Sequence, residues 1–310
     1  MIFVDRKIQL NLLIKRLGKI IYVMKQLREH VKLVNIVYKN DKVPYFRFTG
    51  VNARKYLDEY IALNLDTCTR REIIYSHHEW MRDCTTLVVE DNTVLWKNPG
   101  GDQCIVLRKA SLAPLEGELE FVFQVRDVSI CTLSFVVCRG DLVGIRKKLV
   151  LVIGGLQGRP NTASILREVS KSNREISPAD MLFLACKAFA VESGIKQIVG
   201  YSAEFNSASS HSTLVTMDYG GFWAANNAIA GNEGQYLLDP SLEKDPGDPV
   251  FSSNPSRTRR KRRDKILFKE QVMGNISRAR ILAARMNDNS QTVANPERSL
   301  PRSMQHGTHR

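Results

Sequence analysis

The sequence has few of the features that mark an exported or metal-binding protein. Its six cysteines include no Cys-x-x-Cys pair, although structural zinc sites need thiolates or imidazoles at such short spacing. A secreted disulfide framework is disfavoured too, because it belongs to shorter chains that are denser in cysteine. We therefore expect reduced and mostly buried cysteines, no metal, and a cytoplasmic protein.

Long apolar runs are also missing. The sequence has no stretch of about 18 uncharged apolar residues, the length that can cross a bilayer. The apolar segment 8–14 is interrupted by Gln9 and Asn11 and is followed at once by Lys15 and Arg16. Such a segment does not predict a signal peptide. The chain also has no internal repeat, which disfavours a solenoid.

The composition is that of a globular chain with an excess of positive charge. Hydrophobic residues make up 43% of the 310 residues and charged residues 25%, which suffices for a buried core. The formal net charge of +13 means that an anionic partner has to be considered: nucleic acid, phospholipid headgroups or a phosphorylated small molecule. The charge does not by itself indicate the oligomeric state.

Part of this charge lies in one run near the C-terminus. Specific nucleic-acid binding is not expected there, because the run contains no aromatic residue of the kind that stacks on single strands. A contact with anionic membrane or an acidic protein remains open beside a merely solvated helix start. The run consists of Arg257, Arg259, Arg260, Lys261, Arg262, Arg263 and Lys265.

Residues 6–37 carry apolar side chains at helical spacing, with lysines and arginines between them. The spacing predicts a basic amphipathic helix over residues 1–38, broken near Gly18. Two interpretations of its apolar stripe stay open. The stripe rests on an anionic membrane, which would place the protein at the periphery of the inner membrane, or it packs onto the domain.

The middle of the chain predicts a mainly antiparallel sheet that follows two helices. The helices are expected at 53–62 and 69–80. Alternating apolar and β-branched residues with short turns then predict the strands. These strands are expected at 85–89, 93–96, 104–107, 119–125, 130–137 and 148–153.

Residues 148–202 predict one βαβ crossover. The buried strand ends in a glycine turn at 154–160, and a short helix follows at 162–171. The next helix has strong start signals in Ser177, Pro178 and Asp180, and a strand at 195–202 closes the unit. Two strands joined in this way normally lie parallel.

Several short blocks resemble, in the same order, the VirK/YbjX family of bacterial virulence-associated proteins. The resemblance spans about residues 40–285 and implies a Gram-negative protein tied to surface-protein display, intercellular spread and envelope resistance, without implying a reaction. Ala224 to Asn227 depart from the pattern, because acidic residues are expected there. The blocks are His77-His78-Glu79-Trp80, Gly100-Gly101, Glu116-Gly117-Glu118-Leu119, Leu133-Ser134-Phe135, Gly154-Gly155-Leu156-Gln157-Gly158, Gly194-Ile195, Asp218-Tyr219, Phe222-Trp223 and Arg259 to Lys265.

The glycine turn is the first candidate site. Free backbone N–H groups after a buried strand can hold a phosphate, and the order of elements resembles the acyl-CoA N-acyltransferase layout. A tight structural turn is the alternative, since neither a Walker A nor a Gly-x-Gly-x-x-Gly pattern is present. The predicted ligands of coenzyme A or an acyl carrier are Gly154, Gly155, Gln157, Gly158 and Arg159.

Three further groups complete the candidate residues. His78, Glu79 and Asp218 are candidate catalytic residues, because an imidazole or carboxylate can act as a general base. Tyr219, Phe222 and Trp223 are expected to line a pocket, and the anionic partner is expected at Arg259, Arg260, Lys261, Arg262 and Arg263. Each also has a purely structural interpretation.

These observations predict an α/β or α+β protein with N-terminal helices, a central mainly antiparallel sheet, one crossover and a C-terminal basic helix. Residues 1–38 form the first helix, 39–286 a single domain and 287–310 a disordered tail. Two functions are expected as alternatives. One is a virulence accessory protein that acts on surface proteins or the envelope through acyltransferase-like activity. The other is a non-enzymatic adaptor that contacts membrane or a protein through its basic helices.

Overall fold

The computed structural model describes residues 2–41, 54–83, 92–207, 218–242 and 254–294. Eight strands form one open sheet in the order β1-β2-β3-β4-β5-β6-β8-β7. All neighbouring strands in this sheet are antiparallel except β5 and β6, which are parallel. The predicted α/β class with a mainly antiparallel sheet is thus confirmed.

The elements follow one another along the chain in a simple order. Most predicted strands and helices have counterparts, while the strand expected at 85–89 lies outside the described residues. The helices are α1 (Ile2–Lys25), α2 (Leu27–Asp41), η2 (Lys55–Leu57), α4 (Thr67–Asp83), η3 (Gly140–Val143), α5 (Ala163–Ser172), α6 (Pro178–Glu192), α8 (Tyr219–Ala225) and α9 (Pro255–Ala294). The strands are β1 (Thr93–Lys97), β2 (Gln103–Lys109), β3 (Leu119–Val125), β4 (Val128–Arg139), β5 (Leu149–Gly158), β6 (Ile198–Tyr201), β7 (Ile229–Ala230) and β8 (Gln235–Leu238).

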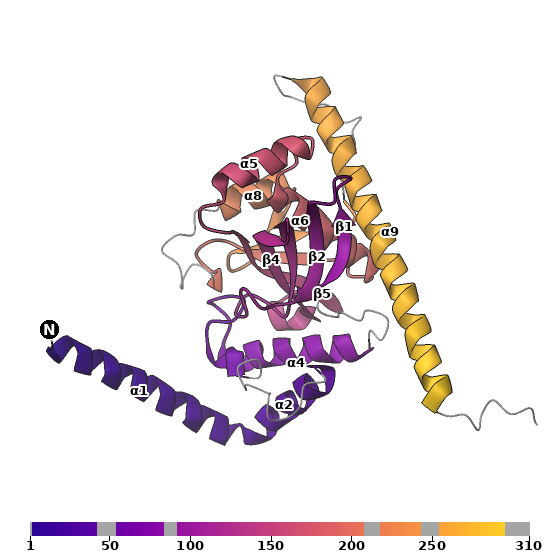
Figure 1. The fold of residues 1–310 in the computed structure, drawn as a ribbon. Helices are drawn as coiled ribbons and strands as arrows, with labels where there is room; N and C mark the ends of the chain where they lie inside the picture. Colours follow the sequence, from indigo (N-terminus) through magenta and orange to yellow (C-terminus); the bar gives the residue numbers. More distant parts are fainter. Residues whose placement is uncertain (1, 42–53, 84–91, 208–217, 243–253, 295–310) are drawn as a thin grey trace, which may run out of the picture.

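Helices cover both faces of the sheet, so its long strands are apolar on both sides. Along β4, Leu133 and Phe135 pack on the face that α6 and α9 cover, while Val136 and Cys138 pack on the face of α2 and α4. Figure 1 shows α4 and α2 below the sheet and α9 along one side of it. This alternation is the period of two that a strand imposes on its side chains.

The crossover between β5 and β6 forms as the sequence predicts. Ser177 precedes α6, and its Oγ accepts a hydrogen bond from Asp180 N at 3.1 Å. Pro178 occupies the first turn, where the missing N–H costs nothing. β5 and β6 pair in parallel through Leu151 and Val152.

Three boundaries differ from the prediction. The N-terminal helix breaks at Gln26 and not at Gly18, because Gly18 lies within α1. A helix was expected at 53–62. Within its described part, Lys55–Leu57 form a short 3-10 turn, and Tyr56 and Tyr60 are buried against α2 and α4. Helix α9 continues to Ala294, so 287–294 are helical where disorder was expected, and 295–310 lie outside the described residues.

The predicted glycine turn after residue 153 is wrong in a way that matters for the site. Strand β5 continues through Gly158 and pairs with β4 along that length. The register shifts where Ser134 faces Gly155 and Phe135 faces Ile153, so Gly154 is the extra residue of a β-bulge. Glycine can continue a strand as well as end it, and local sequence does not separate the two.

Candidate functional site

The segment just before β3 lies against this bulge and brings Glu116 into the protein interior. A Cβ atom on Gly154 would stand 2.1 Å from the backbone oxygen of Glu116, and one on Gly155 would stand 1.7 Å from its Oε2. Only glycine at 155 therefore leaves room for the Glu116 carboxyl. The two glycines predicted to hold a phosphate make space for a carboxyl group instead.

Glu116 lines a cavity of about 320 Å³ where β4 begins and β5 ends. Gln157 donates a hydrogen bond from Nε2 to Glu116 Oε1. Gly158 and Arg159, which were both predicted to bind coenzyme A or an acyl carrier, lie on the wall of the same cavity. The full lining is Leu112, Ala113, Glu116, Ser129, Ile130, Cys131, Thr132, Gln157, Gly158, Arg159 and Pro160.

Burial raises the pKa of Glu116 from 4.5 to about 8, and the charge of nearby Glu120 adds to the effect. Glu120 is fully buried but well partnered, since Arg108 Nε lies 2.7 Å from its Oε1 and Ser111 Oγ lies 3.1 Å from the same atom. Two neighbouring carboxyl groups thus have different environments. The Glu116 carboxyl is the one whose pKa this environment raises.

Tyr219 is a third titratable group near Glu116. Its hydroxyl accepts a hydrogen bond from Leu156 N at 3.3 Å. Burial raises the pKa of Tyr219 to about 12, and the nearby Glu116 contributes to the rise. The phenol therefore remains a neutral hydrogen-bonding group next to the carboxyl.

The other predicted aromatic residues belong to the core. Trp223 is buried, donates from Nε1 to Tyr201 O at 3.1 Å, and packs over Gly200. Phe222 is partly buried against the same cluster. Neither residue lines the Glu116 cavity.

The predicted catalytic residues have separate environments. Asp218 caps α8, because its Oδ1 accepts from Gly221 N at 2.9 Å. Glu79 lies on α4 beside Tyr75, whose pKa is raised first by burial and then by Glu79. His78, also on α4, is buried in an ionic cluster. Their catalytic role stays a prediction.

The ionic cluster around Glu118 is the other group of buried charges near this segment. Lys55 Nζ lies 2.6 Å from Glu118 Oε1, Tyr60 donates to the same oxygen at 2.7 Å, and His78 Nε2 lies 3.6 Å from Oε2. These cations and donors hold the pKa of Glu118 well below its usual range although burial opposes them. A fixed charge of this kind orders the segment but is a poor proton carrier.

His77, the neighbour of His78, contributes to structure. Its Nδ1 accepts a hydrogen bond from Val137 N at 3.2 Å. Burial, then the proximity of His78, lowers its pKa from 6.5 to about 3. His77 is therefore neutral at physiological pH and links α4 to β4.

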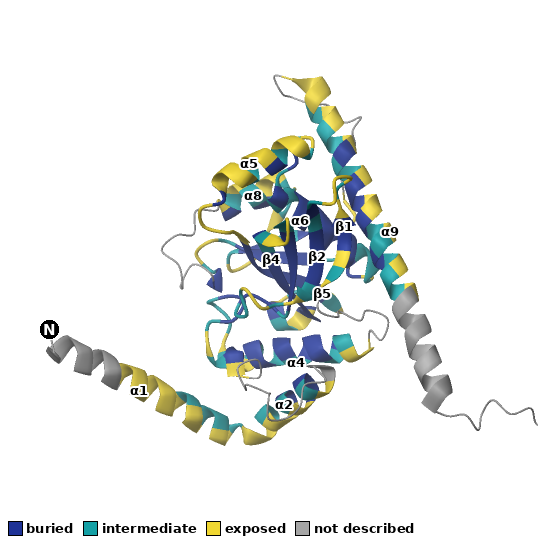
Figure 2. Ribbon diagram, viewed as in Figure 1, coloured by how far each residue is buried: buried dark blue, intermediate teal, exposed yellow. Residues whose placement is uncertain are grey.

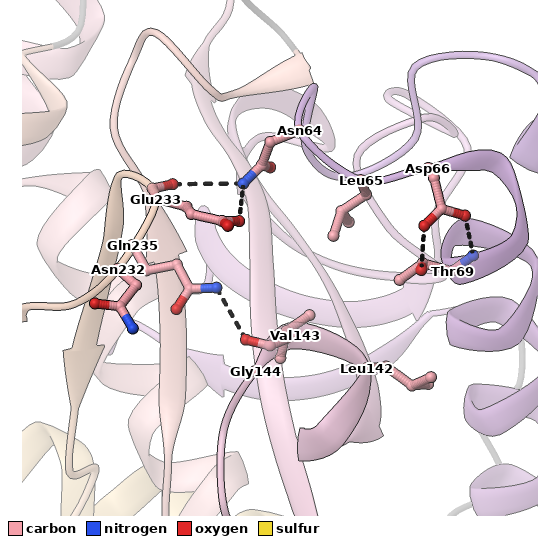
Figure 3. Close-up of a pocket in the computed structure, with 10 residues that line it drawn as sticks. All are labelled: Asn64, Leu65, Asp66, Thr69, Leu142, Val143, Gly144, Asn232, Glu233 and Gln235. Atoms are coloured by element: carbon pink, nitrogen blue, oxygen red, sulfur yellow. Dashed lines mark hydrogen bonds between the residues drawn. The ribbon is translucent and has the colours of Figure 1, made fainter.

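A second cavity of about 240 Å³ lies between α4, η3 and the start of β8 (Figure 3). Several polar side chains that line it form hydrogen bonds with one another. Asn64 Nδ2 donates to Glu233 Oε2 at 3.1 Å, and Thr69 Oγ1 donates to Asp66 Oδ2 at 2.9 Å. Asp66 also accepts from the first N–H groups of α4, so its charge is used to start that helix. We therefore favour the Glu116 cavity as the functional site.

The predicted anion-binding run forms the first turns of α9. Arg259, Arg260 and Arg263 are exposed, while Lys261 and Arg262 are partly buried. Arg257, just before them, pairs with Glu175. Among the described residues, no three His, Cys, Asp or Glu side chains are placed to hold a metal ion.

Glu116 is the residue of the candidate site that sequence reasoning missed. It appeared only within a family block, and nothing in its neighbours marks it as buried. One signal was present: Glu116 and Glu118 flank a glycine directly before a strongly apolar strand, where charged side chains are hard to keep in water.

Comparison with known proteins gives a family but no characterised relative. No curated protein matches the chain, and no solved structure matches it either. Residues 20–265 match the model of a family described as "Protein of unknown function (DUF535)". This match covers most of the 310 residues, and the chain belongs to that family.

Proposed function

We propose that this protein is an acyltransferase-like enzyme in which Glu116 is the general base. The observation that carries the proposal is a buried carboxyl with a pKa near 8 on the wall of a cavity. A base is most effective when its pKa lies near the working pH. Few carboxyl groups meet this condition without a specific environment.

The order of the strands supports the choice of reaction. Antiparallel strands are followed by a parallel β5–β6 pair, a helical crossover between them, and an antiparallel β8 next to β6. This order resembles the layout of acyl-CoA N-acyltransferases. Fold likeness alone does not establish a function, so the proposal rests on Glu116 first.

In the proposed step, the Glu116 carboxylate takes a proton from an amine or hydroxyl acceptor. The acceptor atom then attacks the thioester carbonyl carbon of coenzyme A or an acyl carrier. The carbon–sulfur bond breaks, and the leaving thiolate receives the proton. We place the anionic part of the donor at Arg159, on the exposed rim of the cavity before α5 begins.

The biological role that we propose follows from the resemblance to the VirK/YbjX proteins, which are members of the matched family. The enzyme would modify an envelope component or a surface protein as a virulence accessory factor of a Gram-negative bacterium. A cytoplasmic location suits a donor such as coenzyme A. No described helix is long and apolar enough to cross a membrane.

The test is a ligand screen followed by an activity assay. A ligand at 100 times its Kd stabilises a protein by roughly 2.7 kcal/mol, so coenzyme A or an acyl-CoA should raise the melting temperature measurably. Arg159→Ala should weaken that shift in a salt-dependent way. The matched control is Arg167→Ala, an exposed arginine on α5.

Turnover is measured as thiol release from acyl-CoA in the presence of an amine acceptor. Glu116→Gln should reduce the rate by about 10²–10⁴-fold, the usual contribution of a general base. An unchanged rate in Glu116→Gln would contradict the proposed role of Glu116. If no acyl-CoA ever shifts the melting temperature, the acyltransferase proposal itself fails.

A second candidate is a non-enzymatic adaptor that contacts an acidic protein or a membrane. The exposed arginines at the start of α9 favour this candidate, because their side chains lie at the protein surface and not in the core. In that case, charge reversal at Arg259 and Arg260 would abolish function in cells while Glu116→Gln would not. The two candidates are therefore separable with one pair of variants.

A further inference from the structure

An apolar stripe, here called the α1 stripe, runs along α1 onto the start of α2, and the rest of the protein does not cover it. Nine large apolar side chains between residues 12 and 31 are 46–71% exposed. They account for more than half of the exposed large hydrophobic side chains in the described chain. They are Leu12, Leu13, Ile14, Leu17, Ile20, Ile21, Met24, Leu27 and Val31.

Two interpretations of the predicted N-terminal helix were left open: contact with a membrane and packing onto the domain. In the structure the two helices of this segment have different surroundings, and each fits a different interpretation. Helix α2 packs onto the domain through Leu33, Ile36 and Val37. Helix α1 projects away from the body, and Figure 2 shows it exposed along most of its described length. A contiguous apolar surface of this kind marks an interaction site.

The second half of α1 is held to the body on one side only. Lys19 pairs with Asp58, and Tyr22 packs against the core cluster below the sheet. Arg71 NH1 donates to Gln26 Oε1 at 2.8 Å just after α1 ends. These contacts fix the direction of the helix and leave its apolar stripe outside.

A groove of about 550 Å³ opens onto the same stripe. Ile20 and Met24 belong to both the exposed stripe and the groove wall. Four cations lie on that wall together with a single acid, Asp58, and Lys55 among them also pairs with Glu118. The lining is Arg16, Lys19, Ile20, Val23, Met24, Arg54, Lys55, Leu57, Asp58 and Leu115.

We propose that the α1 stripe and this groove form a docking surface for an anionic lipid bilayer. Residues 11–32 hold six lysines and arginines and one acid, so their charge complements a negative surface. A second copy of this chain would bring the same positive charge against itself. Lys15, Arg16 and Lys19 lie in the middle of α1, where long cationic side chains reach phosphates while the apolar stripe enters the acyl region.

This surface is independent of the Glu116 cavity. Leu115 lines the groove and Glu116 lines the cavity, so adjacent residues border the two. A protein bound through α1 would therefore carry the cavity at a membrane surface. The docking proposal holds whether or not Glu116 has a catalytic role.

The experiment is co-sedimentation of the full chain with vesicles. One set contains phosphatidylcholine alone, and the other contains phosphatidylcholine with phosphatidylglycerol, each at low and high salt. Wild type should bind the anionic vesicles and lose affinity as salt increases. The triple variant Leu13→Ser, Leu17→Ser and Ile21→Ser should bind about tenfold more weakly for each side chain replaced.

Two further variants separate charge from apolar burial. Lys15→Gln with Arg16→Gln should weaken binding about thirtyfold in total and reduce its salt dependence. Matched controls lie on other helices. Leu267→Ser, 52% exposed on α9, and Arg167→Gln with Lys171→Gln on α5 should bind as wild type does.

Three outcomes would overturn the proposal. In the first, the wild-type protein binds neither set of vesicles. In the second, the triple variant binds the anionic vesicles as tightly as wild type does. In the third, light scattering shows that the wild-type protein is a dimer and that the triple variant is a monomer. The stripe would then be an interface with a second copy of this chain and not a membrane-binding surface. Glu116→Gln should bind vesicles normally, so failure of the enzymatic proposal does not affect this test.

Discussion

Replacing Gly155 with alanine tests the packing that creates the Glu116 site. The added methyl carbon would stand 1.7 Å from Glu116 Oε2 and 2.4 Å from Cδ. The carboxyl cannot move freely, because the residue is buried and Gln157 donates a hydrogen bond to its other oxygen. Overpacking of this kind costs about 1–3 kcal/mol. Gly155→Ala should therefore lower the free energy of unfolding by about 2 kcal/mol.

The measurement is thermal unfolding of the apo protein. In proteins of this size, about 1 kcal/mol corresponds to roughly 2–4 °C or less, so a fall of about 4 °C in Tm is expected. Gly158→Ala is the matched control, since its methyl carbon would lie 3.5 Å from Leu166 Cδ1, an ordinary contact. The Tm of that variant should equal the Tm of the wild-type protein.

A double-mutant cycle decides whether the carboxyl is the cause. In a Glu116→Ala background the clash is gone, so Gly155→Ala should cost almost nothing, and the two substitutions should be coupled by about 1–3 kcal/mol. If Gly155→Ala lowers the Tm equally in both backgrounds, the reasoning is refuted. An unchanged apo Tm with loss of a ligand-induced shift would instead restore the phosphate interpretation.

Three further predictions follow from buried or capping groups. The pKa of Glu116 is raised in the folded state from 4.5 to about 8, so its contribution to stability is full below pH 4.5 and is lost as pH rises to about 8. Urea unfolding across this range should show a decline that Glu116→Gln flattens. Glu118→Gln should destabilise by about 3–5 kcal/mol, because it leaves Lys55 buried without its partner charge, and Lys55→Met in addition should recover part of the loss in the same assay. Ser177→Ala should cost about 1 kcal/mol of unfolding free energy through loss of the α6 cap; an unchanged Tm would show that Pro178 suffices to start the helix.

The candidate site could be predicted from sequence only in part. Gln157, Gly158 and Arg159 were expected to act together, and the structure places all three on one cavity wall. Glu116 was not expected, because its burial depends on the missing side chain of Gly155, which lies 39 residues farther along the chain. His78 and Asp218 were chosen for their chemical type, yet the structure gives one an ionic cluster and the other a helix cap.

The sequence by itself determined the elements whose signals are local. The alternation in β3 and β4, the Ser177 cap and the spacing in α4 fix strands and helices through backbone geometry and nearby hydrogen bonds. The tertiary structure decided what lies opposite each side chain. It made Gly154 and Gly155 part of a strand and raised the pKa of Glu116 by excluding water. It also left the α1 stripe uncovered while burying Leu33, Ile36 and Val37 farther along α2. These outcomes depend on contacts between distant segments, and no local pattern in the chain specifies such contacts.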